Sequence, residues 1–354
     1  MADGGKEAGS PAIRFTSIAL GGLLAACLEM VPRPATAGRV CERIPQSPPS
    51  YASRIAAVAC AENSLWYSPF IDEQGRLASL SVAETERVRL QDGATLAWQR
   101  VAEYWKGSGL LAQMSYFPGA NDCSYGDTQH LRAASCRAFL TDTPWSAAFV
   151  SFVMNRAGLP GFAASASHID FIRDAYANPG SPYALQDPDI STPGPGDLLC
   201  FRRGGTPIGP QGLREMLASN SAEGMNMHCD IVVATNTGGD GKLYLVGGNV
   251  LQGVTMRVLP LNRSGMIWGL PRKTSNPVDC QPGNAAACSF NRQDWVAMLK
   301  LKPLPAPTGP LPLPGTQPQS QECCTQCPLP MPADMKRCPV LERPVDMQPG
   351  SSAP

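Results

Sequence analysis

The sequence lacks an excess of either charge. Lys and Arg together number 29, as do Asp and Glu, so the formal net charge of the 354-residue chain is zero. A neutral chain exerts no long-range attraction on nucleic acids or anionic membranes. The chain also lacks a basic stripe interleaved with aromatic side chains, the pattern typical of nucleic-acid binding. We therefore expect no nucleic-acid partner.

Motifs for metals and phosphates are missing as well. The chain has three histidines, and none are arranged as a paired-histidine zinc motif. The glycine-rich run 238–242 has the wrong spacing for a phosphate-binding loop, and no Ser or Thr follows its Lys. The cysteines of segment 323–338 could hold zinc, but no histidine lies nearby, so disulfides are the preferred interpretation there. We expect no metal and no organic cofactor.

The chain has no run long enough to span a bilayer. Its most apolar run, 15–28, follows two basic residues and is shorter than the roughly 20 residues of a spanning helix. This pattern predicts an export signal within residues 1–37. The run Ala35-Thr36-Ala37 suits ordinary cleavage, whereas Leu24-Ala25-Ala26-Cys27 resembles a bacterial lipobox and would leave Cys27 lipidated. The sequence thus predicts export to the periplasm or outer envelope, either free or with a lipid anchor at Cys27.

Cysteine, by contrast, is abundant. Thirteen cysteines in an exported chain indicate an oxidising compartment, and without Cys27 the other twelve could form six disulfides. Close spacing favours three pairs, and a fourth could join neighbouring strands: Cys41–Cys60, Cys123–Cys136 and Cys280–Cys288, with Cys200–Cys229 as the fourth.

Composition divides the chain into four parts. After the signal (1–37) comes a Cys- and Pro-containing, helical region (38–94), in which Ser81 and Glu84 form a capping-box pattern that predicts the start of a helix. Residues 95–300 form the main domain. Residues 301–354 are rich in Pro and Cys and are predicted to be disordered or tied by cysteines.

Two helices are predicted at the start of the main domain. Trp98, Val101, Tyr104 and Trp105 recur at helical spacing, and this helix should end at Lys106-Gly107. In the next helix, Thr143 is the expected N-cap, Pro144 the first helical residue and Gly158 the stop. Ser146 then falls in the first turn, and Trp145 should lie in the core.

A hairpin is predicted further along. The β-rich runs 228–234 and 242–247 are joined by Asn-Thr-Gly-Gly-Asp-Gly, a strong turn signal. If Thr235 pairs with Lys242, the register places Asn249 opposite His228. Strand alternation places Asp230 on the same face as His228.

These residues predict a nucleophilic site. Ser146 at a helix N-terminus would have backbone N–H groups nearby to stabilise an oxyanion. Serine needs a base, for which His228 is the candidate, with Asn249 or else Asp230 holding the imidazole. His168 lies on an apolar helical face and is expected to be a core histidine, with a place as a second imidazole of the site left open.

Four blocks carry a family resemblance. Residues 143–153, 193–201, 228–233 and 246–250 together resemble CHAP-type and NlpC-type amidases and peptidases, and more closely the bacterial domain-of-unknown-function 2272 family, over residues 95–275. The resemblance implies an α+β, papain-like fold with N-terminal helices packed on a small antiparallel sheet. It also implies that Ser146 is the nucleophile, where the amidases have cysteine, that His228 is the base and that Asn249 is the orienting residue.

The resemblance implies hydrolysis or transfer at an amide or ester bond of a cell-envelope substrate, such as a peptidoglycan peptide. Two other functions stay open: a non-catalytic binding or structural module of the envelope, and a lipid-directed acyl hydrolase. A hydrogen bond between Ser146 and His228 would favour the enzyme, whereas a filled cleft or a His228 turned away would favour the module. The oligomeric state is not indicated.

Overall fold

The computed structural model describes residues 37–44, 48–125, 130–274 and 280–309, and the backbone of residues 323–324 and 336–337. All of these lie within one unit, Ala35–Pro354. The predicted signal, including Cys27, is outside the described residues apart from Ala37, and the tail from residue 310 is outside them except for β9 (Cys323–Cys324) and β10 (Lys336–Arg337). Among the described residues, no helix has the length and apolar character needed to cross a membrane.

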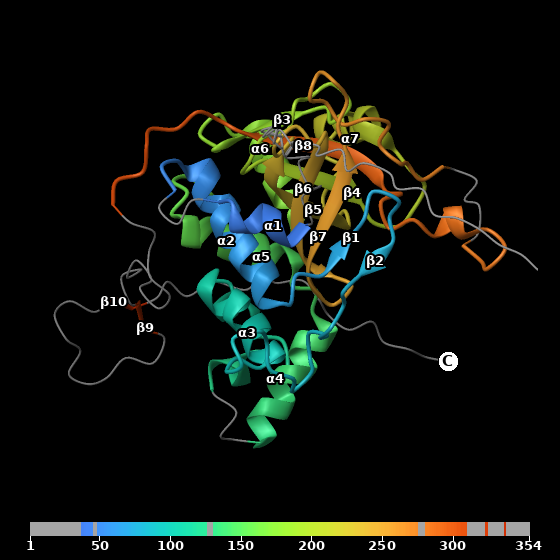
Figure 1. Cartoon of the computed structure of the whole chain (residues 1–354). Coiled ribbons are helices and arrows are strands. Elements are labelled where there is room, and N and C mark those ends of the chain that lie inside the picture. The colour runs from blue at the N-terminus through green and yellow to red at the C-terminus, as the bar shows by residue number, and fades with distance from the viewer. Residues whose placement is uncertain are drawn as a thin grey trace, which may run out of the picture. The chain divides into compact units, whose positions relative to one another are not determined.

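An eight-stranded sheet forms the centre of the fold (Figure 1). Its strands lie in the order β2-β1-β7-β6-β5-β4-β8-β3, and every neighbouring pair is antiparallel except β1 and β7, which are parallel. The strands are β1 (Phe70–Ile71), β2 (Leu77–Ala78), β3 (Tyr183–Gln186), β4 (Leu198–Arg202), β5 (Met227–Thr235), β6 (Lys242–Val250), β7 (Gly253–Pro260) and β8 (Asp294–Leu301).

Helix α5 is the central helix of the fold. It contacts strands β5 and β6 as well as helices α2 and α3, and nearly every one of its residues is buried. The helices are α1 (Ala37–Glu42), α2 (Tyr51–Leu65), α3 (Ala97–Gly107), α4 (His130–Asp142), α5 (Ser146–Ala157), α6 (His168–Ala177) and α7 (Gly209–Ala218), with short 3-10 turns at Leu111–Met114, Asn121–Ser124 and Ala285–Cys288.

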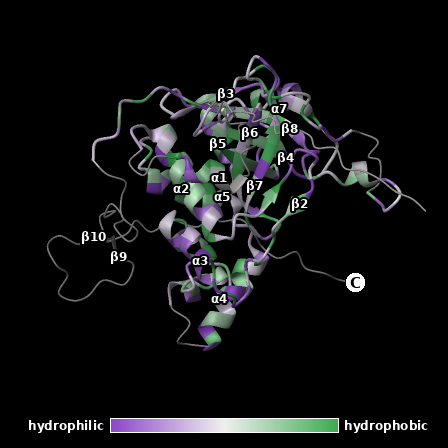
Figure 2. Ribbon diagram, viewed as in Figure 1, coloured by the Kyte–Doolittle hydropathy of each residue, from purple (hydrophilic) through white to green (hydrophobic). Residues whose placement is uncertain are grey.

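Aromatic side chains fill the space around α5. Trp145 stacks on Tyr104 and on Trp66, with ring centroids 5.3 and 6.1 Å apart, and Phe149 meets the Tyr104 ring edge-on. The Trp66 indole donates a hydrogen bond to the Tyr104 hydroxyl (2.9 Å), so these large rings are buried without losing their polar partners. Hydrophobic colouring accordingly concentrates where α5 and the central strands lie (Figure 2).

Several predicted elements are confirmed. Helix α3 ends at Gly107, the hairpin forms as β5 and β6, and Gly158 caps α5 in the left-handed conformation, with a φ of 69°. The start of α5 differs from the prediction: its N-cap is Trp145, two residues after Thr143, so Ser146 is the first helical residue. The four foreseen disulfides are all present: Cys41–Cys60, Cys123–Cys136, Cys200–Cys229 and Cys280–Cys288.

Other expectations were wrong. No helix begins at the Ser81–Glu84 capping-box pattern, because the Glu84 carboxylate is buried against Trp145 and does not cap a helix. Helix α2 was not predicted from the sequence. Its buried face includes the polar residues Arg54, Glu62 and Asn63, so the sequence shows no continuous apolar face at helical spacing. The sheet is also larger than expected, because β3 and β8 extend it beyond the predicted hairpin. The architecture is α+β.

Candidate functional site

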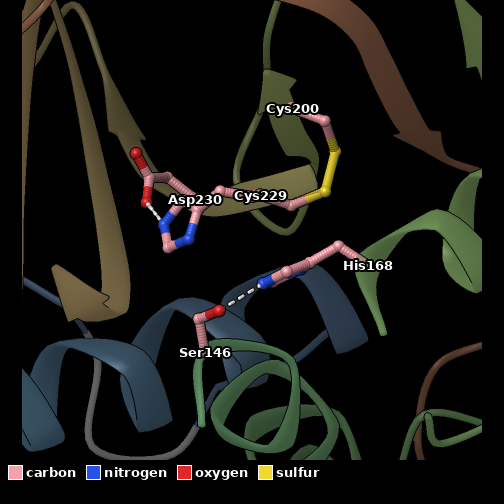
Figure 3. The surroundings of a disulfide bond; sticks show 6 residues. Ser146, His168, Cys200, Cys229 and Asp230 are labelled. Atoms are coloured by element: carbon pink, nitrogen blue, oxygen red, sulfur yellow. Dashed lines mark hydrogen bonds and ion pairs between the residues drawn. A yellow bond between two sulfur atoms is a disulfide. The ribbon is translucent and has the colours of Figure 1, made fainter. Parts of the chain in front are cut away.

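A serine and a histidine meet at the N-terminus of α5. Ser146 Oγ lies 2.8 Å from Nε2 of His168, the first residue of α6, and the two side chains point toward one another (Figure 3). The first backbone hydrogen bond of α5 runs from Phe149 N to Trp145 O, so the N–H groups of Ser146 and Ala147 have no acceptor within the helix. These N–H groups and the helix dipole favour negative charge beside the serine.

Burial keeps His168 neutral. His168 is 4% exposed, and burial lowers its pKa well below the ordinary histidine value; repulsion from His228, whenever that ring is protonated, and from Arg203 acts in the same direction, whereas Asp230 opposes the shift. A neutral imidazole can accept the serine proton at Nε2, which places its own hydrogen on Nδ1. Nδ1 has no hydrogen-bond partner among the described residues, so no hydrogen bond from a third described residue orients this ring.

His228 belongs to a separate, fully paired network. Its Nε2 lies 2.8 Å from Asp230 Oδ1 and its Nδ1 lies 2.7 Å from Arg203 Nη2. A guanidinium only donates, so Nδ1 accepts, and the ring hydrogen is on Nε2, facing the carboxylate. The ring is completely buried, and burial lowers its pKa even though Asp230 opposes that shift. The His228 and His168 rings lie 5.1 Å apart, centroid to centroid.

Asp230 is the charged centre of this network. Its Oδ2 accepts from Arg257 Nε at 2.9 Å, and Arg257 is only 3% exposed. Burial by itself raises the pKa of Asp230, but the interactions with His228 and Arg257 outweigh it and hold that pKa well below the usual range. Arg257 also donates to the Asn291 side chain at 2.9 Å. A buried charge pair with this many hydrogen bonds has its desolvation largely compensated.

A second buried carboxylate holds the start of α5. The Trp145 indole donates to Glu84 Oε2 at 2.5 Å. The Asn249 amide, oriented with its nitrogen toward Glu84, donates to the same oxygen at 3.1 Å and accepts from the Trp145 backbone N–H at 3.3 Å. Burial raises the pKa of Glu84, although the Trp145 hydrogen bond opposes the shift. Glu84 and Asn249 therefore fix the residue that precedes Ser146.

The expected hydrogen bonds of the site are not those that form. Ser146 Oγ is hydrogen-bonded to His168 and not to His228, and Asn249 is hydrogen-bonded to Glu84 and Trp145 and not to His228. The alternative, Asp230 holding His228, is present. The catalytic roles of Ser146, His228 and Asn249 stay predictions.

Strand alternation explains the outcome. His228 and Asp230 lie opposite Phe201 and Leu199 on β4, which belong to the core cluster on the sheet face away from α5. Cys229 lies between them in sequence and packs in the cluster that includes α5. The predicted register of the hairpin is nearly correct. Between the turn and a bulge at Val232–Ala234 the observed pairing is shifted by one residue, and beyond the bulge the predicted pairing holds, at Val232 with Leu245 and at Ile231 with Val246.

Three participants were missed from sequence: Glu84, Arg203 and Arg257. Arg257 carried a usable signal, because it is the one charge within the apolar run of β7, and a charge buried in a strand needs a partner. Arg203 follows β4 directly and gave no pattern. Glu84 gave a misleading pattern, the capping box. Among the described residues, no group of three His, Cys, Asp or Glu side chains could hold a metal ion.

Comparisons with known proteins bear on the family alone. A family model described as "Uncharacterized protein conserved in bacteria (DUF2272)" matches residues 92–301, more than half of the chain. No curated protein and no solved structure matches the chain. The matched range contains Ser146, His168, His228 and Asn249, whereas Glu84 precedes it.

Proposed function

Since the chain belongs to the bacterial family DUF2272, whose description names no activity, we propose its function from the site itself. We propose a hydrolase or transferase that attacks an amide or ester bond of a cell-envelope substrate, with Ser146 as nucleophile and His168 as base. The observation that carries the proposal is the 2.8 Å contact between Ser146 Oγ and His168 Nε2 at a helix N-terminus.

The proposed reaction has two halves. His168 Nε2 takes the hydroxyl proton as Ser146 Oγ attacks the carbonyl carbon, and the resulting imidazolium returns the proton to the leaving amine or alcohol. The N–H groups of Ser146 and Ala147 would hold the oxyanion of each tetrahedral intermediate. Water, or an acceptor amine or hydroxyl, then releases the acyl group by the reverse sequence, and the serine regains its proton.

The surrounding networks position these groups in the proposal. Glu84 and Asn249 hold Trp145 and thereby the first turn of α5. His228, fixed by Asp230 and Arg203, packs against the His168 ring and limits its rotation. In this arrangement His228 supports the base and does not itself accept the serine proton.

The proposed location is the cell envelope. The four disulfides are compatible with an exported protein, since such bonds persist in oxidising compartments. The export signal and the lipid anchor at Cys27 remain part of the proposal. So does the relation to CHAP-type and NlpC-type amidases, together with their papain-like fold.

One observation favours the second candidate, a non-catalytic envelope module. Ser146 and His168 are each 4% exposed, and both ring nitrogens of His228 are occupied. As an enzyme, the protein must therefore open near α6 to admit a carbonyl group to Ser146. As a module, it would keep the Ser146–His168 pair only as a core hydrogen bond.

Labelling with a serine-reactive fluorophosphonate separates the two candidates. The oxidised protein should label at Ser146, and Ser146→Ala and His168→Asn should each abolish labelling. Ser151→Ala is the matched control, because Ser151 is a buried serine of the same helix, hydrogen-bonded to Ser165, and should leave labelling unchanged. Absence of labelling in protein with native circular dichroism and with the four described disulfides formed would favour the module.

A further inference from the structure

A small pocket lies beside the His228 network. It has a volume of about 160 Å³, and its lining includes Arg203, Arg257 and Asn249. Arg203 donates to His228, and Asn249 accepts from the backbone N–H of Trp145. The pocket wall therefore contacts both the histidine network and the residue before Ser146.

The charge at this pocket is positive. Arg203 and Arg257 contribute two guanidinium groups, whereas Asp230, which binds Arg257, contributes the one carboxylate of the network. No acidic side chain lines the pocket in the part of the chain that the structure describes. Because His228 is neutral, one positive charge is left over, and it belongs to Arg203.

Most N–H donors of the Arg203 guanidinium have no partner among the described residues. Among the described residues, its side chain makes a single hydrogen bond, to a neutral imidazole, and no ion pair. A guanidinium carries five N–H donors in a planar fork that matches the two oxygens of a carboxylate. An arginine held by one edge of the fork, at the wall of a pocket, can offer its remaining N–H groups to a ligand.

The turn between β6 and β7 forms another part of the pocket wall. Leu251 and Gln252 are the two residues between the paired Val250 and Gly253, and their positive φ values, of 55° and 63°, are those of a tight hairpin turn. Asn249, at the bulge that precedes the turn, has a φ of 53°. Asn249, Val250 and Leu251 line the pocket together with Arg203 and Arg257.

We propose that this pocket binds a free carboxylate of the substrate through Arg203. The inference rests on the proposed function only in calling the ligand a substrate. A carboxylate carries one negative charge and matches the single unpaired positive charge, whereas a phosphate monoester carries close to two at neutral pH. The substrate class is then a peptide or acyl compound with a free carboxylate near the scissile bond, supplied by a chain terminus or by an acidic side chain.

Binding can be measured without catalysis. The full-length oxidised protein carrying Ser146→Ala is labelled with ¹⁵N-histidine, which gives only three imidazoles to follow. It is titrated with N-acetyl-Ala-Ala, with the C-terminal amide of that peptide, with N-acetyl-Glu-Ala-amide and with methyl phosphate. Comparing N-acetyl-Ala-Ala with N-acetyl-Glu-Ala-amide distinguishes recognition of a terminal carboxylate from recognition of a side-chain carboxylate. The His228 Nδ1 resonance reports directly on the guanidinium bound to it.

One or both carboxylate peptides should shift the His228 Nδ1 resonance and bind about tenfold more tightly than the neutral amide. Arg203→Gln should abolish this preference, and Arg203→Lys should restore it in part. Arg202→Gln is the matched control. Arg202 is the adjacent arginine, and within the described ranges its side chain hydrogen-bonds the Thr206 carbonyl and no other group, so its loss should leave the preference intact.

Three results would overturn the proposal. The first is that the carboxylate peptides and the amide bind with equal affinity, or that none of them binds. The second is a preference for carboxylate that survives Arg203→Gln, and the third is tighter binding of methyl phosphate than of the carboxylate peptides. These outcomes are independent of the reactivity of Ser146, because the variant under test lacks that hydroxyl. Failure of fluorophosphonate labelling would contradict the proposed function, whereas the carboxylate site would still be tested by this titration alone.

Discussion

Gly247→Ala should disrupt the hydrogen bonds of Asp230 by placing a methyl group against its carboxylate. A Cβ at position 247 would lie 2.0 Å from Asp230 Oδ1, 3.0 Å from its Cγ and 2.8 Å from Val250 Cγ2. The carboxylate cannot move aside cheaply, because His228 and Arg257 hold its two oxygens at 2.8 and 2.9 Å. Overpacking costs about 1–3 kcal/mol, and separating a buried charge from its partner costs about 3–5 kcal/mol. We therefore expect the free energy of unfolding to fall by about 3 kcal/mol.

Urea unfolding of the oxidised protein measures this change, and a loss of that size should lower the midpoint by about 1 M. Gly283→Ala is the matched control: its φ is not in the left-handed region, and a Cβ there would meet nothing within 4 Å. An alanine at such a site usually stabilises by about 0.4–1 kcal/mol through the unfolded state. The two substitutions should therefore have opposite signs. A loss below about 1 kcal/mol at Gly247 would refute the claim that Asp230 is rigidly held.

Two further predictions concern pH. The pKa values of His168 and His228 are lowered in the folded state, so below about pH 6.5 the unfolded chain binds more protons than the folded protein. As the pH decreases below that value, the free energy of unfolding should therefore fall by up to about 1.4 kcal/mol per pH unit for each ring. Unfolding midpoints that stay constant from pH 6.5 to 5 would contradict this, and His168→Asn should reduce the slope. The pKa of Glu84 is raised, so ionising it weakens the folded state, and Glu84→Gln should gain stability over the wild type as pH rises above the ordinary value of 4.5. A stability difference that does not change with pH would contradict the raised pKa.

Local features were largely readable from the sequence. The spacing of Trp98, Tyr104 and Trp105 was enough to predict α3, and the turn sequence 236–241 was enough to predict the hairpin and its register to within one residue. Cysteine spacing predicted three disulfides, because short loops bring their ends together at low entropic cost. These features depend on residues that are close in sequence.

The tertiary structure decided which histidine meets Ser146. Strand alternation alone shows that His228 and Cys229 face opposite sides of the sheet, but not which side a helix will cover. Helix α5 covers the side of Cys229, so the imidazole that reaches Ser146 comes from α6, which the sequence assigned to the core. Likewise, the Glu84 carboxylate finds Trp145 and Asn249 only after elements far apart in sequence have packed. The sequence by itself determined local elements such as α3 and the β5–β6 hairpin, together with the polar residues that they carry. The layer order of helix and sheet, set by burial of apolar area over the whole domain, determined the partners of those residues.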